Sequence, residues 1–243
     1  MAALPKVVSI NDAINKAGRQ RMLSQRAAKS YMALGQNVLP DLSQKVLAAS
    51  LALFDAQLVE LAAYSPTAEI GATYNELKAT WAEYKAAVSK VPDLPGAERV
   101  ILLSGKVLQL ANRGTVQLEG VSGNPTGQLI NVAGRQRMLS QRMAAFYLAS
   151  SWHVQGVASL AVVTAARDEF VKAHLLLRSA PETTESIKSE LAIADMQFTF
   201  FEAALQSLKP GESNAQASAN VFTTSERILQ VMNNVTGMYE KLT

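Results

Sequence analysis

Cysteine is absent from this chain of 243 residues, and histidine, aromatic residues, glycine and proline are all scarce. Without cysteine the protein has neither disulfide bonds nor thiolate metal ligands, which is compatible with the periplasm and the cytoplasm alike. The two histidines, His153 and His174, have no second metal ligand at helical spacing, so no metal site is predicted. Scarce glycine and proline, with 49% hydrophobic residues, are typical of a helix-rich globular protein.

A strong excess of charge is also missing. The net charge is +3, and outside one repeated motif the basic residues are spread along the chain. A nucleic-acid partner would need a broader basic stripe, so none is expected. The sequence shows no nucleophile–base pair, no carboxylate dyad and no complete phosphate loop, so we predict neither an enzyme nor a cofactor.

Long hydrophobic runs are absent as well. Spanning a bilayer takes roughly 20 apolar residues, and the most apolar run, residues 157–166, is about half as long. We therefore expect no direct membrane insertion. Residues 1–6 show no basic segment followed by an apolar one, so we expect an export signal to be absent or already removed.

The chain does contain one ten-residue stretch twice. Residues 17–26, AGRQRMLSQR, return as residues 133–142 at a spacing of 116. Over residues 14–33 and 130–149, 15 of 20 positions are identical, whereas the remainder of the two halves has diverged. Near the end of each half, residues match at a spacing of 121: Gln109, Asn112, Thr115 and Glu119 correspond to Gln230, Asn233, Thr236 and Glu240. The duplication therefore covers each half as a whole.

The spacing of apolar residues predicts helices along almost the whole chain and no sustained strand. A motif helix over about 9–35 is followed by apolar stripes at steps of three and four residues, the pattern of helices that face a bundle core. The stripes of the first half cover residues 47–61, 70–88 and 100–120. Those of the second half cover residues 170–177, 187–208 and 228–242.

Short breaks separate these predicted helices. They fall at residues 35–40, at Ser65-Pro66 with the proline expected at a first helical position, at residues 92–96 and at a hinge over 120–127. Because short loops force neighbouring helices to be antiparallel, each half is predicted to be an up-down four-helix bundle. We expect an all-α fold with two tandem bundles, residues 9–121 and 126–243, arranged as a pseudo-twofold intramolecular dimer.

The arginines of the motif point in different directions on a helix. Arg19 and Arg26 lie on one side, whereas Arg21 points roughly 200° away from Arg19. Arg21 shares its face with mostly small residues, which allow another helix to approach closely. These are Ile14, Ala17, Gly18, Gln25 and Ala28, and the same surroundings return at Arg137 as Ile130, Ala133, Gly134, Gln141 and Ala144.

An arginine on a close-packed helix face needs a partner, because an unpaired buried charge is costly. The motif contains no acidic residue. If the two motif helices run side by side and parallel, Arg21 and Arg137 converge, and a planar oxyanion could be bound by both guanidinium forks. The alternative is an internal ion pair with a carboxylate of another helix. The candidate carboxylates are Glu60, Glu119 and Glu240.

The other motif residues are expected to be mainly structural. Ser24, Gln25, Ser140 and Gln141 could donate to an anion or to neighbouring backbone. Arg19, Arg26, Arg135 and Arg142 are expected to be structural or solvated, and Met22, Leu23, Met138 and Leu139 to be core residues. His174 lies on a core stripe, where we expect a partly buried, hydrogen-bonded histidine.

Residues 14–26, INKAGRQRMLSQR, resemble the signature of PilJ-type sensor domains, the N-terminal domain of type IV pili methyl-accepting chemotaxis transducers. They are also similar to the P-box of NarX-type nitrate/nitrite sensor kinases. The resemblance implies a periplasmic four-helix sensor module that dimerises and binds nitrate between its two first helices, through one arginine of each helix and helix backbone. The P-box pattern places these arginines at Arg21 and Arg137.

Our leading hypothesis is a non-enzymatic sensor that binds nitrate or nitrite and signals to a downstream signalling or transport protein. A pseudo-dimer needs no second chain, so we expect a monomer. The expected anion-binding residues are Ala17, Gly18, Arg21, Gln25, Ala133, Gly134, Arg137 and Gln141. The alternative is a protein-interaction module of a pilus, chemotaxis or transport system with no small-molecule ligand.

Overall fold

The computed structural model describes residues 6–154, 156–206, 209, 212 and 214–242, and this part of the chain contains helices and no strands. Eight helices follow one another in the described residues. They are α1 (Ile10–Gly35), α2 (Pro40–Tyr64), α3 (Ala68–Val88), α4 (Leu94–Ser122), α5 (Pro125–Ser151), α6 (Gly156–Ser179), α7 (Glu185–Leu205) and α8 (Ala215–Glu240). The predicted core position Leu208 lies outside the described residues.

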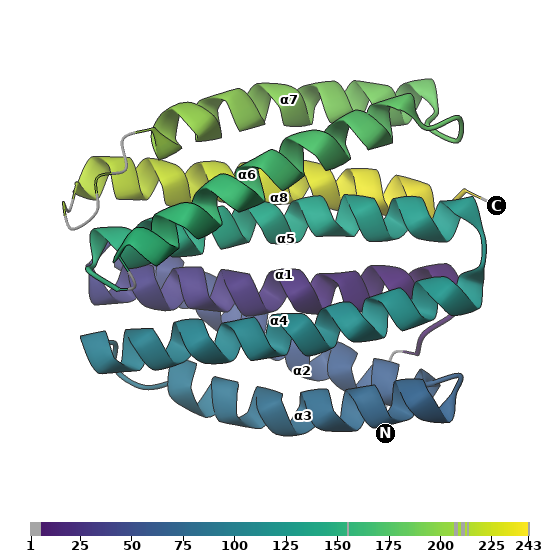
Figure 1. The fold of residues 1–243 in the computed structure, drawn as a ribbon, viewed down its shortest axis with the longest axis horizontal. Helices are drawn as coiled ribbons and strands as arrows, with labels where there is room; N and C mark the ends of the chain where they lie inside the picture. Colours follow the sequence, from purple (N-terminus) through teal and green to yellow (C-terminus); the bar gives the residue numbers. More distant parts are fainter. Residues whose placement is uncertain (1–5, 155, 207–208, 210–211, 213, 243) are drawn as a thin grey trace.

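The helices form two up-down bundles, α1–α4 and α5–α8, that meet along their first helices (Figure 1). α1 and α5 lie in the middle of the molecule and contact each other more extensively than any other two helices. They are parallel and nearly in register, since Gln36 after α1 donates to the carbonyl of Leu148 near the same end of α5 at 2.8 Å. The predicted fold class is confirmed.

The connection between the bundles is tighter than expected. Most of the predicted hinge over 120–127 is helical, and only Gly123 and Asn124 separate α4 from α5. Gly123 has a φ of +61°, and its N–H donates to the carbonyl of Glu119 at 3.0 Å. Asn124 accepts from the N–H of Gly127 at 2.7 Å and so caps α5. One helix ends and the next begins within two residues, beside the start of α1.

Two other helix boundaries differ from the prediction. Pro66 precedes α3 and is not at a first helical position. The break expected over 92–96 is mostly the first turn of α4, which begins at Leu94. Asp93 caps this helix by accepting from the N–H of Gly96 at 2.6 Å, and a proline in a first turn removes no helical hydrogen bond.

By length and composition α2 could cross a membrane, and it is the one such helix in the described part of the chain. This helix contains no long continuous apolar run, because polar residues such as Ser43 and Asp55 interrupt its sequence. Its apolar stripe lies in the bundle core, where Phe54 stacks on Trp81 with ring centroids 3.6 Å apart. A core helix of a bundle meets the same criterion, so this helix alone does not predict a span.

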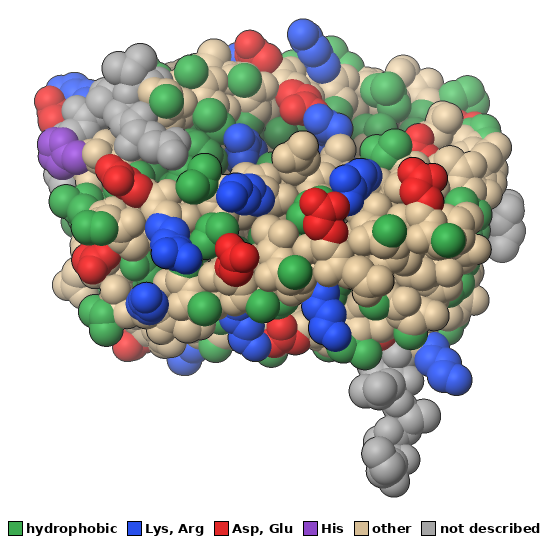
Figure 2. Space-filling model, turned by 60° about the horizontal axis from the view of Figure 1, so that its bottom comes forward, with side chains coloured by type: hydrophobic (Ala, Val, Ile, Leu, Met, Phe, Trp, Pro, Cys, Tyr) green, Lys and Arg blue, Asp and Glu red, His purple; other side chains and the backbone are tan. Residues whose placement is uncertain are grey.

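Charged side chains of both signs are interspersed on the face that lies at the bottom of Figure 1, as Figure 2 shows. No large area of one sign covers this face. This distribution agrees with the small net charge of the sequence and offers no basic stripe there for a nucleic acid.

Candidate functional site

Two glycines lie opposite each other where α1 and α5 meet. An ideal Cβ on Gly18 would lie 3.8 Å from the Cα of Gly134, and the reverse distance is also 3.8 Å. The same added carbon would lie 3.3 Å from Nη2 of Arg21, and one on Gly134 would lie 3.1 Å from Nη2 of Arg137. The two glycines therefore make room both for the close approach of the helices and for the two guanidinium groups.

Arg21 is completely buried, and its guanidinium reaches from α1 to α4 and α5. Nη1 donates to Oδ1 of Asn112 on α4 at 2.8 Å. Nη2 donates to Oδ1 of Asn131 on α5 at 2.7 Å and to the carbonyl of the same residue at 3.1 Å. Amide oxygens thus occupy the two ends of the fork.

Arg137 has nearly the same surroundings, related by the pseudo-twofold axis. It is completely buried, and its Nη1 donates to Oδ1 of Asn233 on α8 at 3.0 Å. Nη2 donates to the carbonyl of Asn15 on α1 at 3.3 Å. The Nε atoms of Arg137 and Arg21 are both buried and have no hydrogen-bond partner, so the Nε–H donor of each guanidinium is unused.

The predicted internal carboxylates do not pair with these arginines. Glu119 accepts from Nδ2 of Asn131, and Glu240 accepts from Nδ2 of Asn15, so both carboxylates are one side chain away from the guanidinium groups. Glu60 pairs with Lys16 at 2.6 Å. Within the part of the chain that the structure describes, no carboxylate lies at ion-pair distance from either arginine.

The electrostatics of the pair are unfavourable. Burial lowers the pKa of Arg137 well below its usual range, and the nearby charges of Arg19 and Arg21 lower it further. The pKa of Arg21 is lowered by burial and by Arg135, against the attraction of Glu119. Because guanidinium groups keep their proton in proteins, the two positive charges remain together inside the fold at a cost in stability.

The other expected ligands surround the pair but are directed elsewhere. Ala17 and Ala133 are buried beside the glycines. Nε2 of Gln25 donates to the carbonyl of Ser104 on α4 at 3.2 Å, and Nε2 of Gln141 donates to that of Ser225 on α8 at 2.9 Å. Ser24 and Ser140 donate to backbone carbonyls within their own helices. In the structure these four side chains donate to backbone carbonyls of their own or a neighbouring helix.

Two of the other motif arginines follow the structural expectation. Arg26 donates through Nε to Glu226 at 3.0 Å, and Arg135 pairs with Glu169. His174 is buried, as expected, and its Nε2 lies 2.9 Å from Oδ1 of Asp195, but neither ring nitrogen has a hydrogen bond of acceptable geometry to a described residue, so the expected hydrogen-bonded histidine is not found. The described residues contain no group of three potential metal ligands. The predicted core methionines and leucines of the motif are buried, namely Met22, Leu23, Met138 and Leu139.

Sequence reasoning missed the residues that bond the arginines. Asn15 and Asn131 are identical between the two motif copies, and Asn112 and Asn233 are among the matched residues of the last helices. The repeat therefore contained the signal, although the asparagines were not assigned a role. Tyr74 gave no sequence signal, although its buried hydroxyl has no hydrogen-bond partner and interacts electrostatically with Arg21.

The comparison with protein families identifies both halves. The family model described as "Type IV pili methyl-accepting chemotaxis transducer N-term", PilJ, matches residues 4–113 and again residues 122–238. The chain has no significant match among curated proteins or among solved structures. The resemblance to nitrate/nitrite sensor kinases stays a prediction. With nearly its whole length covered by two matches, the chain belongs to the PilJ family and carries two of its sensor domains in tandem.

Proposed function

We propose that this protein is a non-catalytic sensor that binds a small oxyanion, nitrate or nitrite, between α1 and α5. The observation that carries the proposal is the pair of fully buried guanidinium groups, Arg21 and Arg137, with no carboxylate at ion-pair distance in the described residues. A bound monoanion would offset one of the two positive charges and accept the hydrogen bonds of the free Nε donors.

Nitrate suits this place because it is planar, singly charged and weakly hydrated. A planar anion can accept two parallel hydrogen bonds from an arginine fork, and two opposed forks can hold it from both sides. A dry site between packed helices favours an anion that loses little hydration on entry. The pairing of glycines at this level provides the close backbone approach.

Binding would be reported through the asparagines. In the structure, Oδ1 of Asn131 accepts a hydrogen bond from Nη2 of Arg21, while Nδ2 of the same side chain donates to Glu119 on α4. An anion that takes the place of this oxygen would release Asn131 and weaken its bond to the end of α4. Asn15 is likewise bonded to Glu240 on α8 through Nδ2, but it accepts from Arg137 through its backbone carbonyl. Occupancy would thus change the position of α4, which a partner protein can recognise.

Isothermal titration calorimetry with sodium nitrate, against sodium chloride at equal ionic strength, tests the site. We expect about one nitrate per chain, and at least a tenfold loss of affinity in Arg21→Met and in Arg137→Met. The control variant Arg113→Gln removes an exposed arginine that pairs with Glu76. Absence of heat with the wild-type protein, or unchanged binding in both methionine variants that remain folded by circular dichroism, contradicts the proposal.

A protein-interaction module without a small ligand is the second candidate. The observation that favours it is the exposed apolar side chains on one side of α7, Ile193, Met196 and Phe200, at helical spacing. In that case the asparagine bonds of Arg21 and Arg137 would be the final state of the pair, and nitrate would cause no heat. The periplasm, where sensors of the resembled families work, is the compartment that we propose for either function.

A further inference from the structure

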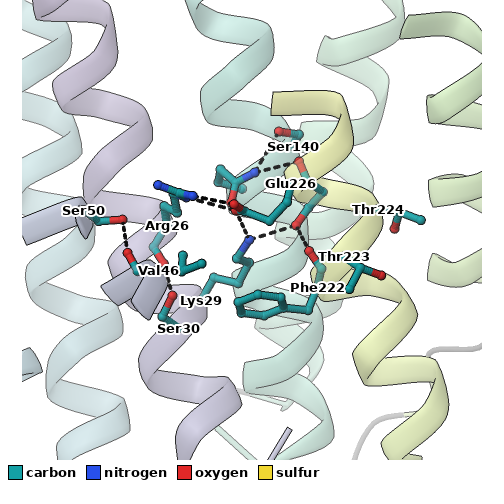
Figure 3. A network of polar contacts seen from close by, with 12 residues as sticks. Arg26, Lys29, Ser30, Val46, Ser50, Ser140, Phe222, Thr223, Thr224 and Glu226 are labelled. Atoms are coloured by element: carbon teal, nitrogen blue, oxygen red, sulfur yellow. Dashed lines mark hydrogen bonds and ion pairs between the residues drawn. The ribbon is translucent and has the colours of Figure 1, made fainter. Parts of the chain in front are cut away.

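The two halves differ at a second pair of equivalent arginines, Arg26 on α1 and Arg142 on α5. Arg26 is part of a partly buried network, drawn in Figure 3, in which Glu226 on α8 accepts from two cations of α1. Nε of Arg26 donates to Glu226 at 3.0 Å, and Nζ of Lys29 donates to it at 2.6 Å. Lys29 also lies over the ring of Phe222, 4.2 Å from its centroid. Glu226 thus supplies Arg26 with a carboxylate partner, and the three charged side chains together carry a net charge of +1.

The equivalent carboxylate is missing on the other side. Gln25 bonds the carbonyl of Ser104, and its counterpart Gln141 bonds that of Ser225, which fixes the correspondence of α4 with α8. The residue after Ser225 is Glu226, whereas the residue after Ser104 is Gly105. No atom of the surrounding structure lies within 4 Å of an ideal Cβ on Gly105. The start of a side chain at this position would therefore meet no neighbouring atom.

Arg142 shows the effect of this substitution. In the described residues no carboxylate lies at ion-pair distance from it, and its Nη1 donates instead to Oε1 of Gln25 at 3.2 Å. One face of its guanidinium rests on Phe146, 4.7 Å from the ring centroid. The counterpart of the Gln25 oxygen, Oε1 of Gln141, is buried without a partner, because Arg26 bonds Glu226. Arg142 thus uses a substitute acceptor.

A cavity of about 290 Å³ opens beside Arg142 between α4, α5 and α6. Its lining combines Arg142 and the ion pair of Arg135 with Glu169, which together carry a net charge of +1. The remaining walls are mostly apolar and include Leu108, Met138 and Val162. A single negative charge with a short apolar tail matches both the charge and the walls of this cavity.

We propose that this cavity is a second binding site, for a small monocarboxylate with an apolar tail. The ligand carboxylate takes on Arg142 the place that Glu226 takes on Arg26, and the tail lies against the apolar walls. The arginine then exchanges the amide oxygen of Gln25 for a charged acceptor, a stronger hydrogen bond. This site lies apart from the Arg21–Arg137 pair and does not depend on the nitrate proposal.

The test measures binding of acetate, butyrate and benzoate by calorimetry in a carboxylate-free buffer. We expect saturable binding of butyrate or benzoate, weaker binding of acetate, and none of n-butanol. Arg142→Gln should weaken the carboxylates at least tenfold. Gly105→Glu supplies the carboxylate of Glu226 from within the chain, so it should abolish binding and raise the melting temperature above that of Gly105→Ala. The Gly105→Ala variant keeps the cavity open and should bind as the wild type does.

Three results would overturn the inference. The first is no saturable binding of any of the three carboxylates to the wild type. The second is unchanged binding in Arg142→Gln and Gly105→Glu, both checked for folding by circular dichroism. The third is binding that persists in Arg142→Gln and disappears in Arg21→Met, since the carboxylate would then occupy the central pair. A nitrate titration that shows no binding changes none of these three carboxylate measurements. The nitrate proposal and the carboxylate proposal can therefore fail separately.

Discussion

The two halves have diverged to different extents at the centre of the molecule, where α1 meets α5, and at its flanks, where α1 meets α8 and α5 meets α4. At the α1–α5 contact, Arg21 and Arg137 have equivalent asparagine partners and each lies against a glycine. At the flanks, Arg26 on α1 pairs with a glutamate of α8 and has a lysine beside it, whereas Arg142 on α5 has neither. Symmetry is thus retained where the halves meet and lost where each half contacts the other's last helix.

The difference has a physical reason. At the centre, every residue faces residues of the equivalent helix, so a larger side chain in one copy must be accommodated by the other copy as well. At the flanks, α8 packs against α1 and α4 packs against α5, and each of these contacts can change independently. A chain that contains its own pseudo-dimer can therefore have one symmetric site and different surroundings on its two sides.

The largest effect is expected where the flanks differ most. Glu226→Ala leaves Lys29, whose side chain is fully buried, without its carboxylate, and removing one partner of a buried ion pair costs about 3–5 kcal/mol. The equivalent change, Gly105→Ala, removes no partner and should be neutral or slightly stabilising. Urea unfolding of the two variants measures both. A loss under about 1 kcal/mol for Glu226→Ala would show that the flanks do not differ energetically.

A smaller loss is expected from widening the central contact. Gly18→Leu and Gly134→Leu place side chains where even a Cβ lies 3.8 Å from the opposite backbone, and overpacking of this kind costs typically about 1–3 kcal/mol. The two variants should lose equal amounts, because the contact is symmetric. Gly237→Leu, in α8 with open space around its Cα, is the matched control. Clearly unequal losses for Gly18 and Gly134, in thermal unfolding, would contradict the symmetry.

The smallest effect concerns His174, which stands where the first half has Leu58. Burial lowers the pKa of His174, and Arg178 adds to this, while Asp195 opposes it. Because the folded-state pKa lies below the unfolded one, stability is complete above about pH 6.5 and decreases as the pH falls through the folded value. His174→Leu should remove this decrease, about 1 kcal/mol or less between pH 7 and 5.

Unfolding at several pH values tests the histidine prediction. The exposed His153 has a φ of +63°, so His153→Asn is a suitable control and should keep the pH dependence of the wild type. An acid profile that is the same in His174→Leu and in the wild type would show that His174 is not the titrating group.

Periodicity and the repeat were sufficient to predict the fold, because bundle helices have regular apolar stripes and the loops are short. Helix ends were predicted less well, since a cap such as Asp93 or Asn124 allows proline and glycine to lie within a first turn. The convergence of Arg21 and Arg137 followed from helix geometry. Their asparagine partners did not, because Asn112 and Asn233 come from helices whose rotation about their axes only the packed structure defines.

The two-residue link at Gly123 and Asn124 has a consequence for the proposed anion site. A site shared between separate subunits is complete only at concentrations that favour association, so its apparent affinity depends on the amount of protein. Here both halves of the site belong to one chain, and the short link gives each half a high effective concentration near the other. If the proposed site binds its anion, the ligand threshold would therefore be the same whether the cell makes few copies of the protein or many.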